Sequence, residues 1–62
     1  MEIFVIDSNF TIRMLGKYPD NPIPKTGERI NLGYTPCVNV KDITYDYKNK
    51  QVYVLIDGFI VE

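Results

Sequence analysis

Residues 43–57, with the sequence ITYDYKNKQVYVLID, decide the fold of this chain. Two short runs rich in β-branched and aromatic residues, 43–47 and 51–57, flank a polar break at residues 48–50. Apolar and polar residues that alternate on both sides of such a break are typical of a β-hairpin. The stretch therefore predicts two antiparallel strands joined by a short turn.

The register of this hairpin follows from the number of residues in its loop. An even number gathers the large apolar side chains on one face, as the pairs Tyr47–Val52, Tyr45–Val54 and Ile43–Ile56, and we expect this face to be part of the core. Loops over residues 49–50 and 48–51 both satisfy this condition. Because residues 48–51 contain no glycine, the longer loop, built on a type I turn, is favoured. In that register Tyr53 and Leu55 lie on the opposite face, where they are half-buried unless something covers them.

The residues before the hairpin change parity. Val38 and Val40 are even-numbered, whereas the apolar residues from Ile43 onward are odd-numbered. A period of two cannot keep both sets on one face. The change predicts either a β-bulge at residues 41–42 or a bend of the strand from one sheet face to another.

A second hairpin is predicted at the beginning of the chain. Residues 2–6 are apolar without a break from Ile3 onward, which is typical of a strand covered on both faces, and residues 7–9 have turn chemistry. Residues 10–15 alternate, with Phe10, Ile12 and Met14 on one face. An amphipathic helix over residues 9–17 is the alternative interpretation of this second run.

The segment between the hairpins is irregular. Residues 17–27 carry three prolines, which exclude a helix and favour a stiff, extended loop. Two interpretations stay open: Tyr18 and Ile23 cover one end of the barrel, or the loop is a recognition element that uses Tyr18, Asn21 and Ile23. Residues 27–33 predict a short strand with Ile30 and Leu32 inward, and residues 34–36 predict a turn. Residues 59–62 predict a last short strand, which completes the sheet or pairs with another subunit.

Together these elements predict an all-β protein with a single domain over residues 1–62. The expected architecture is a small antiparallel β-barrel or sandwich of five or six short strands. The layout P-x-x-G-E-x-I-x-L over residues 24–32, followed by V-x-V at 38–40 and the hairpin, resembles small SH3-like β proteins. Many of these are accessory proteins of phages and mobile elements, so the resemblance implies an SH3-like barrel and a binding or inhibitory (anti-defence) role. It covers residues 24–57, the hairpin of residues 2–15 departs from it, and it carries over no functional residue.

The residue types limit the chemistry that the chain can perform. It has no histidine and one cysteine, Cys37, which thus lacks a histidine base and is expected to be a small buried hydrophobe. A tetrahedral site of nitrogen and sulfur ligands cannot be assembled, nor can an intrachain disulfide. No glycine-rich loop leads into a helix to hold a phosphate. We therefore expect no catalytic residues, no metal, no cofactor and no enzymatic activity.

Charge and size indicate the kind of partner. The net charge is −1 and no basic run is present, which argues against nucleic acid. A single-strand nucleic-acid-binding barrel, which stacks bases on tyrosines, remains the alternative function, and a structural subunit of a larger particle is another. Because a chain of 62 residues buries only about 60% of its unfolded surface, self-association is the expected source of further stability.

The expected function is binding of a protein partner, with the chain itself a homodimer. The candidate interface residues are Tyr53, Leu55, Phe59 and Ile60. Residues 1–3 lack the basic start of a signal peptide, and no apolar stretch reaches membrane-spanning length, so we expect a cytoplasmic protein.

Overall fold

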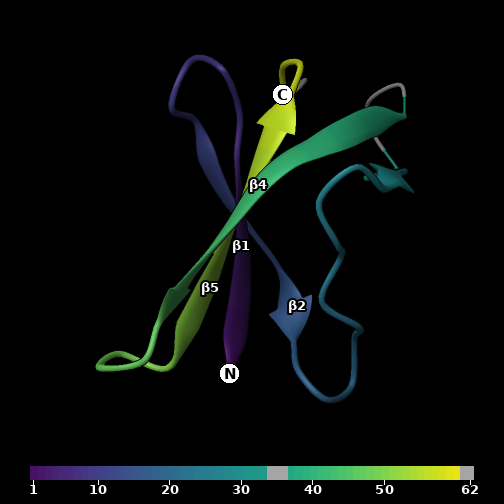
Figure 1. Cartoon of the computed structure of the whole chain (residues 1–62). Coiled ribbons are helices and arrows are strands. Elements are labelled where there is room, and N and C mark those ends of the chain that lie inside the picture. The colour runs from purple at the N-terminus through teal and green to yellow at the C-terminus, as the bar shows by residue number, and fades with distance from the viewer. Residues whose placement is uncertain (34–36, 61–62) are drawn as a thin grey trace.

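The computed structural model describes residues 1–33 and 37–60 of the chain. The predicted turn at residues 34–36 and the last two residues of the predicted final strand lie outside these ranges. The described part contains five strands and no helix, so the all-β prediction is confirmed (Figure 1). The strands are β1 (Glu2–Ile6), β2 (Ile12–Lys17), β3 (Arg29–Ile30), β4 (Val38–Asp46) and β5 (Gln51–Asp57).

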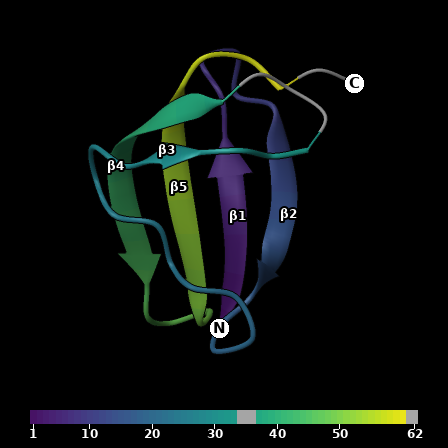
Figure 2. The ribbon, with the colours of Figure 1, turned by 90° about the vertical axis from the view of Figure 1, so that its right-hand side faces the viewer.

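All five strands belong to one sheet, in the order β2-β1-β5-β4-β3. The sheet curls into a half-barrel, and the segment between β2 and β4 crosses its concave side (Figure 2). Strands β1 and β5 pair in parallel, whereas the other three pairs are antiparallel. The prediction of a purely antiparallel sheet was therefore wrong. Each strand's alternation is a local property, and it does not encode which two hairpin strands become neighbours.

The N-terminal hairpin formed by β1 and β2 is confirmed, and the helical alternative for residues 9–17 is excluded. Met14 pairs with Phe4 and Ile12 pairs with Ile6, so these side chains share the outer, convex face of the sheet. A bulge opposite residues 3–4 turns Leu15 toward the concave side, where it packs against the core. The alternation of residues 10–15 was thus predicted correctly. Its apolar residues Ile12 and Met14, however, lie on the convex face and not in the core.

The hairpin of β4 and β5 is also confirmed, with a register displaced by two residues. Tyr45 pairs with Val52 and Ile43 with Val54, which leaves a loop over residues 47–50 in place of 48–51. The Asp46 carboxylate accepts hydrogen bonds from the Asn49 side-chain nitrogen at 2.9 Å and its backbone N–H at 3.2 Å. These bonds start the turn one residue earlier than predicted and lower the pKa of Asp46.

The displaced register corrects the prediction that Tyr45 and Tyr47 belong to the core. Tyr47 lies in the loop and is 78% exposed, and Tyr45 is 46% exposed at the end of β4. The predicted β-bulge, by contrast, is confirmed, because the register shifts between Val40 and Asp42. The bulge brings Val40 before it and Ile43 after it onto the same, inner side.

The core lies on the concave side of the sheet. Ile3 and Val5 of β1 and Val52 and Val54 of β5 are completely buried. Further residues from β4, β5 and the C-terminal segment complete it: Val38, Val40, Ile56 and Ile60. The crossing segment covers this core with partly buried side chains, as predicted for Ile30 and Leu32, and with Ile23.

A buried carboxylate connects the two ends of the chain. Asp7 is 1% exposed, and its Oδ1 atom accepts hydrogen bonds from the backbone N–H groups of Asn9 at 2.9 Å and Thr11 at 2.8 Å. Its Oδ2 atom accepts one from the N–H of Ile60 at 2.8 Å. Phe59 and Ile60 are not in a strand, so the predicted final strand is wrong for the described residues. The hydrogen bond from Ile60 to Asp7 fixes this segment, in place of the strand pairing that the sequence predicted.

The same bonds make the stability of the fold sensitive to acid. The N–H of Ile60 stabilises the ionised carboxylate most, and with those of Thr11 and Asn9 it outweighs desolvation, so the pKa of Asp7 is lowered. A lowered pKa in the folded state contributes stability above the ordinary value of about 3.9, and this stability is lost as the pH falls through the folded value.

We predict that Asp7→Asn lowers the melting temperature at pH 7, because an amide carries no charge and only one acceptor oxygen. The difference from the wild type should begin to shrink below about pH 4, where the unfolded carboxylate becomes protonated, and shrink further as the pH falls through the lowered pKa of folded Asp7. Thermal unfolding followed by circular dichroism between pH 7 and pH 2.5 measures this. Asp20→Asn, at an exposed position, is the control. A difference that stays constant over this range would contradict the prediction.

Candidate functional site

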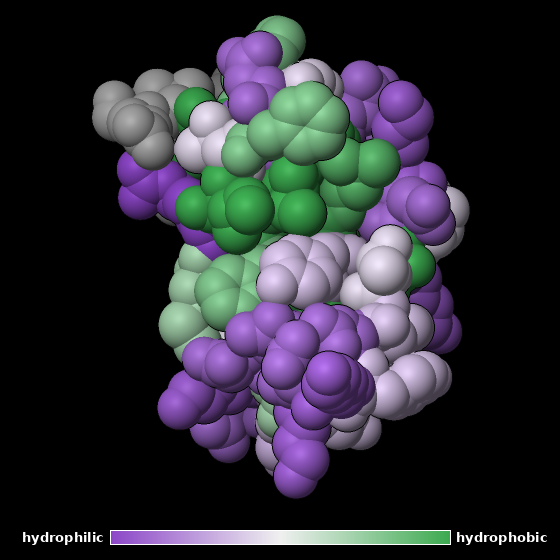
Figure 3. Space-filling view, turned by 90° about the vertical axis from the view of Figure 1, so that its left-hand side faces the viewer, coloured by the Kyte–Doolittle hydropathy of each residue, from purple (hydrophilic) through white to green (hydrophobic). Residues whose placement is uncertain are grey.

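The outer face of the sheet carries a continuous set of apolar side chains. Cross-strand pairing aligns them in two rows, Met14–Phe4–Tyr53 and Ile12–Ile6–Leu55, across strands β2, β1 and β5. Ile12 is 54% exposed and Met14 is 48% exposed, whereas the other four are half-buried. We call these six residues the outer apolar face; Figure 3 shows apolar surface across the middle of this side of the molecule.

The outer apolar face is ordered by contacts within the chain. The rings of Phe4 and Tyr53 stack with their centroids 5.6 Å apart and their planes at 21°. The Tyr53 hydroxyl donates a hydrogen bond of 2.7 Å to Oε1 of Gln51. These contacts fix the two large side chains against each other, and therefore this part of the face is preformed.

Polar residues border this face on two sides. Asp42 pairs with Leu55, and Thr44 pairs with Tyr53, so both lie beside the apolar rows on β4. Glu2 pairs with Lys17 at the end of the face that lies nearest the N-terminus. Hydrophilic surface fills the lower part of Figure 3. An apolar centre with a polar border is the usual composition of a protein–protein contact surface.

The four residues expected at an interface occupy three different environments. Tyr53 and Leu55 lie on the outer apolar face, where their pairing places them. Phe59 is 57% exposed after the end of β5. Ile60 is 8% exposed and belongs to the core, so its side chain is not part of the outer surface. Ile12 and Met14 were missed because the strand alternation alone does not tell which face is covered.

Phe10, in the turn that leads into β2, combines exposure with an unfavourable backbone conformation. Its side chain is 82% exposed, and its φ angle is 63°. The left-handed region costs a residue with a Cβ atom roughly 1–2 kcal/mol, and asparagine tolerates it best after glycine. Lys50, at the end of the other hairpin loop, has the same conformation with a φ of 54°.

We predict that Phe10→Asn and Lys50→Asn each stabilise the fold by roughly 0.5–1 kcal/mol, because asparagine relieves the left-handed strain. Denaturation by urea, followed by circular dichroism, measures both changes. Phe10→Ala, which keeps the strain and removes the exposed ring, is the control and should gain less than Phe10→Asn. Equal stability of Phe10→Asn and Phe10→Ala would contradict the role of backbone strain.

The predicted recognition loop lies on the opposite, concave side. Tyr18 is 51% exposed, Asn21 is exposed, and Ile23 packs against the core, so the loop contributes both to the core and to the surface. The side-chain amide of Asn21 lies over Gly16, where an added Cβ atom would overlap it. A larger residue at position 16 would displace the Asn21 side chain from this place.

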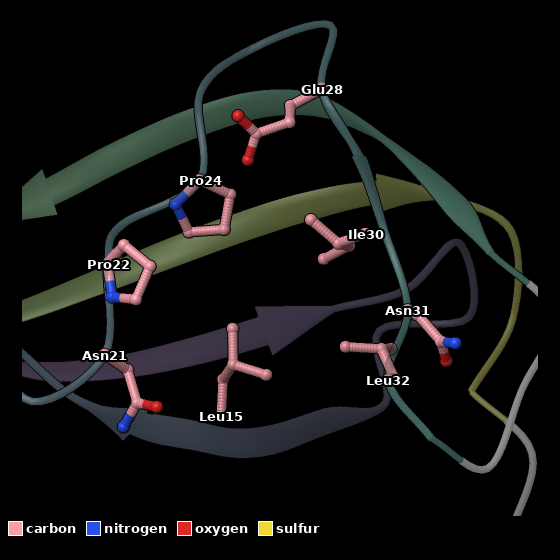
Figure 4. Close-up of a pocket in the computed structure, with 8 residues that line it drawn as sticks. All are labelled: Leu15, Asn21, Pro22, Pro24, Glu28, Ile30, Asn31 and Leu32. Carbon is pink, nitrogen blue, oxygen red and sulfur yellow. The ribbon is translucent and has the colours of Figure 1, made fainter.

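The loop and the approach to β4 enclose a slot of about 280 Å³. Its walls are mostly apolar: Pro22 and Pro24 on one arm, Ile30 and Leu32 on the other, and Leu15 at the base (Figure 4). Asn21, Glu28 and Asn31 supply the polar groups. Asn31 uses its side-chain oxygen to accept a hydrogen bond of 2.8 Å from the N–H of Gly33.

The tip of the β4–β5 hairpin presents an exposed aromatic pair. The rings of Tyr45 and Tyr47 stack with their centroids 6.0 Å apart and their planes at 10°. Lys48 and Lys50 follow in the same loop and are exposed. The sequence assigned both tyrosines to the core, and the register displaced by two residues places them here instead.

The side chains that could react or bind a metal ion do not cluster in the described part of the chain. Cys37 is exposed and has a free thiol, which corrects the prediction of a buried side chain. Residues 1–33 and 37–60 contain no group of three or more histidine, cysteine, aspartate or glutamate side chains placed to hold a metal ion. No helix that could cross a membrane occurs in that part of the chain.

Comparison with known proteins gave no match: no family model, no curated protein and no solved structure is significantly similar to this chain.

Proposed function

We propose that this chain is a non-enzymatic binding protein that acts through protein–protein contact and self-associates through the outer apolar face. The observation that carries the proposal is the pair of apolar rows on the convex side, in which Ile12 and Met14 are about half exposed and the other four side chains are only partly buried. Apolar surface of this continuity on a small domain marks a contact site. A cytoplasmic accessory or inhibitor protein that works by occupying its partner fits such a surface.

The size of the molecule is compatible with a homodimer. Its two largest dimensions are 30 and 22 Å, so one broad face covers roughly 660 Å². Stable interfaces begin at about 600 Å² per partner. A second copy placed face to face therefore reaches the lower limit of a stable interface only when it uses most of the outer side. The same association buries the surface that a core of this size leaves exposed.

We predict that Met14→Glu weakens self-association by about tenfold or more, because it places a carboxylate in the apolar centre of the interface. Met14 is 48% exposed within one chain, so the fold should remain intact. It is a better test than Tyr53→Glu, which also removes the stacking on Phe4. Light scattering coupled to size exclusion, over a range of concentrations, measures the assembly.

Tyr47→Glu is the matched control, since it introduces the same charge at an exposed aromatic residue outside the outer apolar face. It should leave self-association unchanged. A wild-type chain that stays monomeric at millimolar concentration would overturn the dimer, and equal effects of the two substitutions would overturn the choice of face.

The exposed tyrosine pair supports a second candidate function, the binding of single-stranded nucleic acid at the hairpin tip. Bases stack on exposed aromatic rings beside basic residues, and Tyr45, Tyr47, Lys48 and Lys50 provide both. Against it stand the net charge of −1 and the adjacent Asp46. These charges weaken the attraction to phosphate, so this function ranks second.

For this candidate we expect a fluorescein-labelled oligothymidylate to bind at low salt and Tyr47→Ala to weaken binding about fivefold or more, the loss typical of one stacked base. Fluorescence anisotropy measures it. Tyr18→Ala, another exposed tyrosine that lies away from the hairpin, is the control. The absence of binding at 20 mM salt would rule this candidate out.

A further inference from the structure

The half-barrel has an open seam between its two edge strands. Strand β2 forms one edge and β3 the other. Because β3 contains only Arg29 and Ile30, it does not pair with β2. The slot of about 280 Å³ is lined from both edge strands, by Leu15 of β2 at its base and by Ile30 of β3 (Figure 4).

The outer edge of β2 carries backbone groups available for pairing. The N–H of Asp7 donates to the carbonyl of Thr11 at 3.1 Å, so Thr11 directs its backbone groups toward β1. Directions alternate along an antiparallel strand, and hence the N–H and C=O groups of Ile12 and Met14 point away from β1. In the described part of the chain, no backbone hydrogen bond from outside the strand reaches these groups. Such an edge accepts an added strand.

The slot adds specificity to this edge. Its apolar walls match the aliphatic stem of a long side chain. Glu28 is the single charged residue among the lining residues, and its carboxylate points toward the space between the two arms in Figure 4. Within residues 1–33 and 37–60, Glu28 forms no ion pair. A lysine or arginine side chain complements an apolar slot with a carboxylate at its rim.

We propose that the open seam binds an extended peptide of another protein. The peptide adds a strand to the outer edge of β2, hydrogen-bonded to Ile12 and Met14, and inserts a lysine or arginine side chain into the slot toward Glu28. This site takes the proposed protein-binding function further by naming a partner chemistry. It does not require self-association, because the peptide uses the backbone groups of Ile12 and Met14, whereas the outer apolar face uses their side chains, and the slot lies on the other side of the sheet.

A second copy of the chain fits this edge less well than a separate peptide. An antiparallel β2–β2 pair that uses the outward groups of Ile12 and Met14 places Arg13 directly opposite Arg13 of the other copy. Like charges directly opposite each other destabilise a strand pair. The edge therefore favours a partner whose residues differ from those of β2.

The test is a selection from random twelve-residue peptides displayed on phage, against the wild type and Glu28→Lys. We expect peptides selected by the wild type to share one lysine or arginine between β-branched residues. With Glu28→Lys, a synthetic copy of a selected peptide should bind about tenfold more weakly or worse, the fold-change expected when a charge-assisted hydrogen bond is lost. Replacing its basic residue by glutamate should restore binding to Glu28→Lys.

Asp20→Lys is the control, because it makes the same charge change at an exposed acid that does not line the slot. Amide exchange followed by NMR tests the position of the peptide, which should protect the N–H groups of Ile12 and Met14. Light scattering should show that Glu28→Lys leaves self-association unchanged, so a failure here is distinguishable from a failure of the homodimer.

Three results of the peptide experiments would overturn the proposal, and one result of the light scattering would do so as well. The three are the absence of any selected peptide, selected peptides without a common basic residue, and binding that leaves the amides of β2 unprotected. Binding by the edges of two copies, revealed by dimerisation that Met14→Glu does not affect, would also overturn it in favour of the second copy.

Discussion

The parallel pairing of β1 with β5 is the interaction on which the rest of the structure depends. Each hairpin alone is a two-stranded unit, which is marginally stable in water. The pairs Ile3–Val52 and Val5–Val54 join the two hairpins, and all four side chains are completely buried. Burying an aliphatic side chain contributes about 1.5–3 kcal/mol, so the contact between β1 and β5 supplies a large part of the stability of the fold. Asp7 extends the connection past the end of β1 by holding the N–H of Ile60.

The same pairing creates both surfaces to which we assign binding. It aligns the outward side chains of β2, β1 and β5 into the outer apolar face, which no single strand could form. It also leaves β2 at the edge of the sheet, because β1 has β5 on its other side. The loop that follows β2 folds back over Gly16 and forms one wall of the slot beside that edge.

Much of the local structure could be predicted from the sequence, because it depends on neighbouring residues. Both hairpins, the bulge at residues 41–42 and the inward direction of Ile30 and Leu32 follow from parity and turn chemistry. The register error of two residues has a local cause that the sequence does contain. Asp46 and Asn49 have the spacing of a turn in which a carboxylate accepts from the residue three positions later. Hydrophobic parity is the same in both registers and cannot choose between them, whereas this turn signal can.

The sequence by itself determined the two hairpins, the bulge between Val40 and Asp42 and which residues of each strand share a face, since a period of two is a property of the local backbone. Only the tertiary structure decided which strands are neighbours, which face of each is covered and which edge stays open. Those choices depend on contacts between residues far apart in the chain, such as Ile3 with Val52. For this reason Ile12, Met14 and Glu28 became candidate binding residues only in the folded chain, and Ile60 proved to be part of the core.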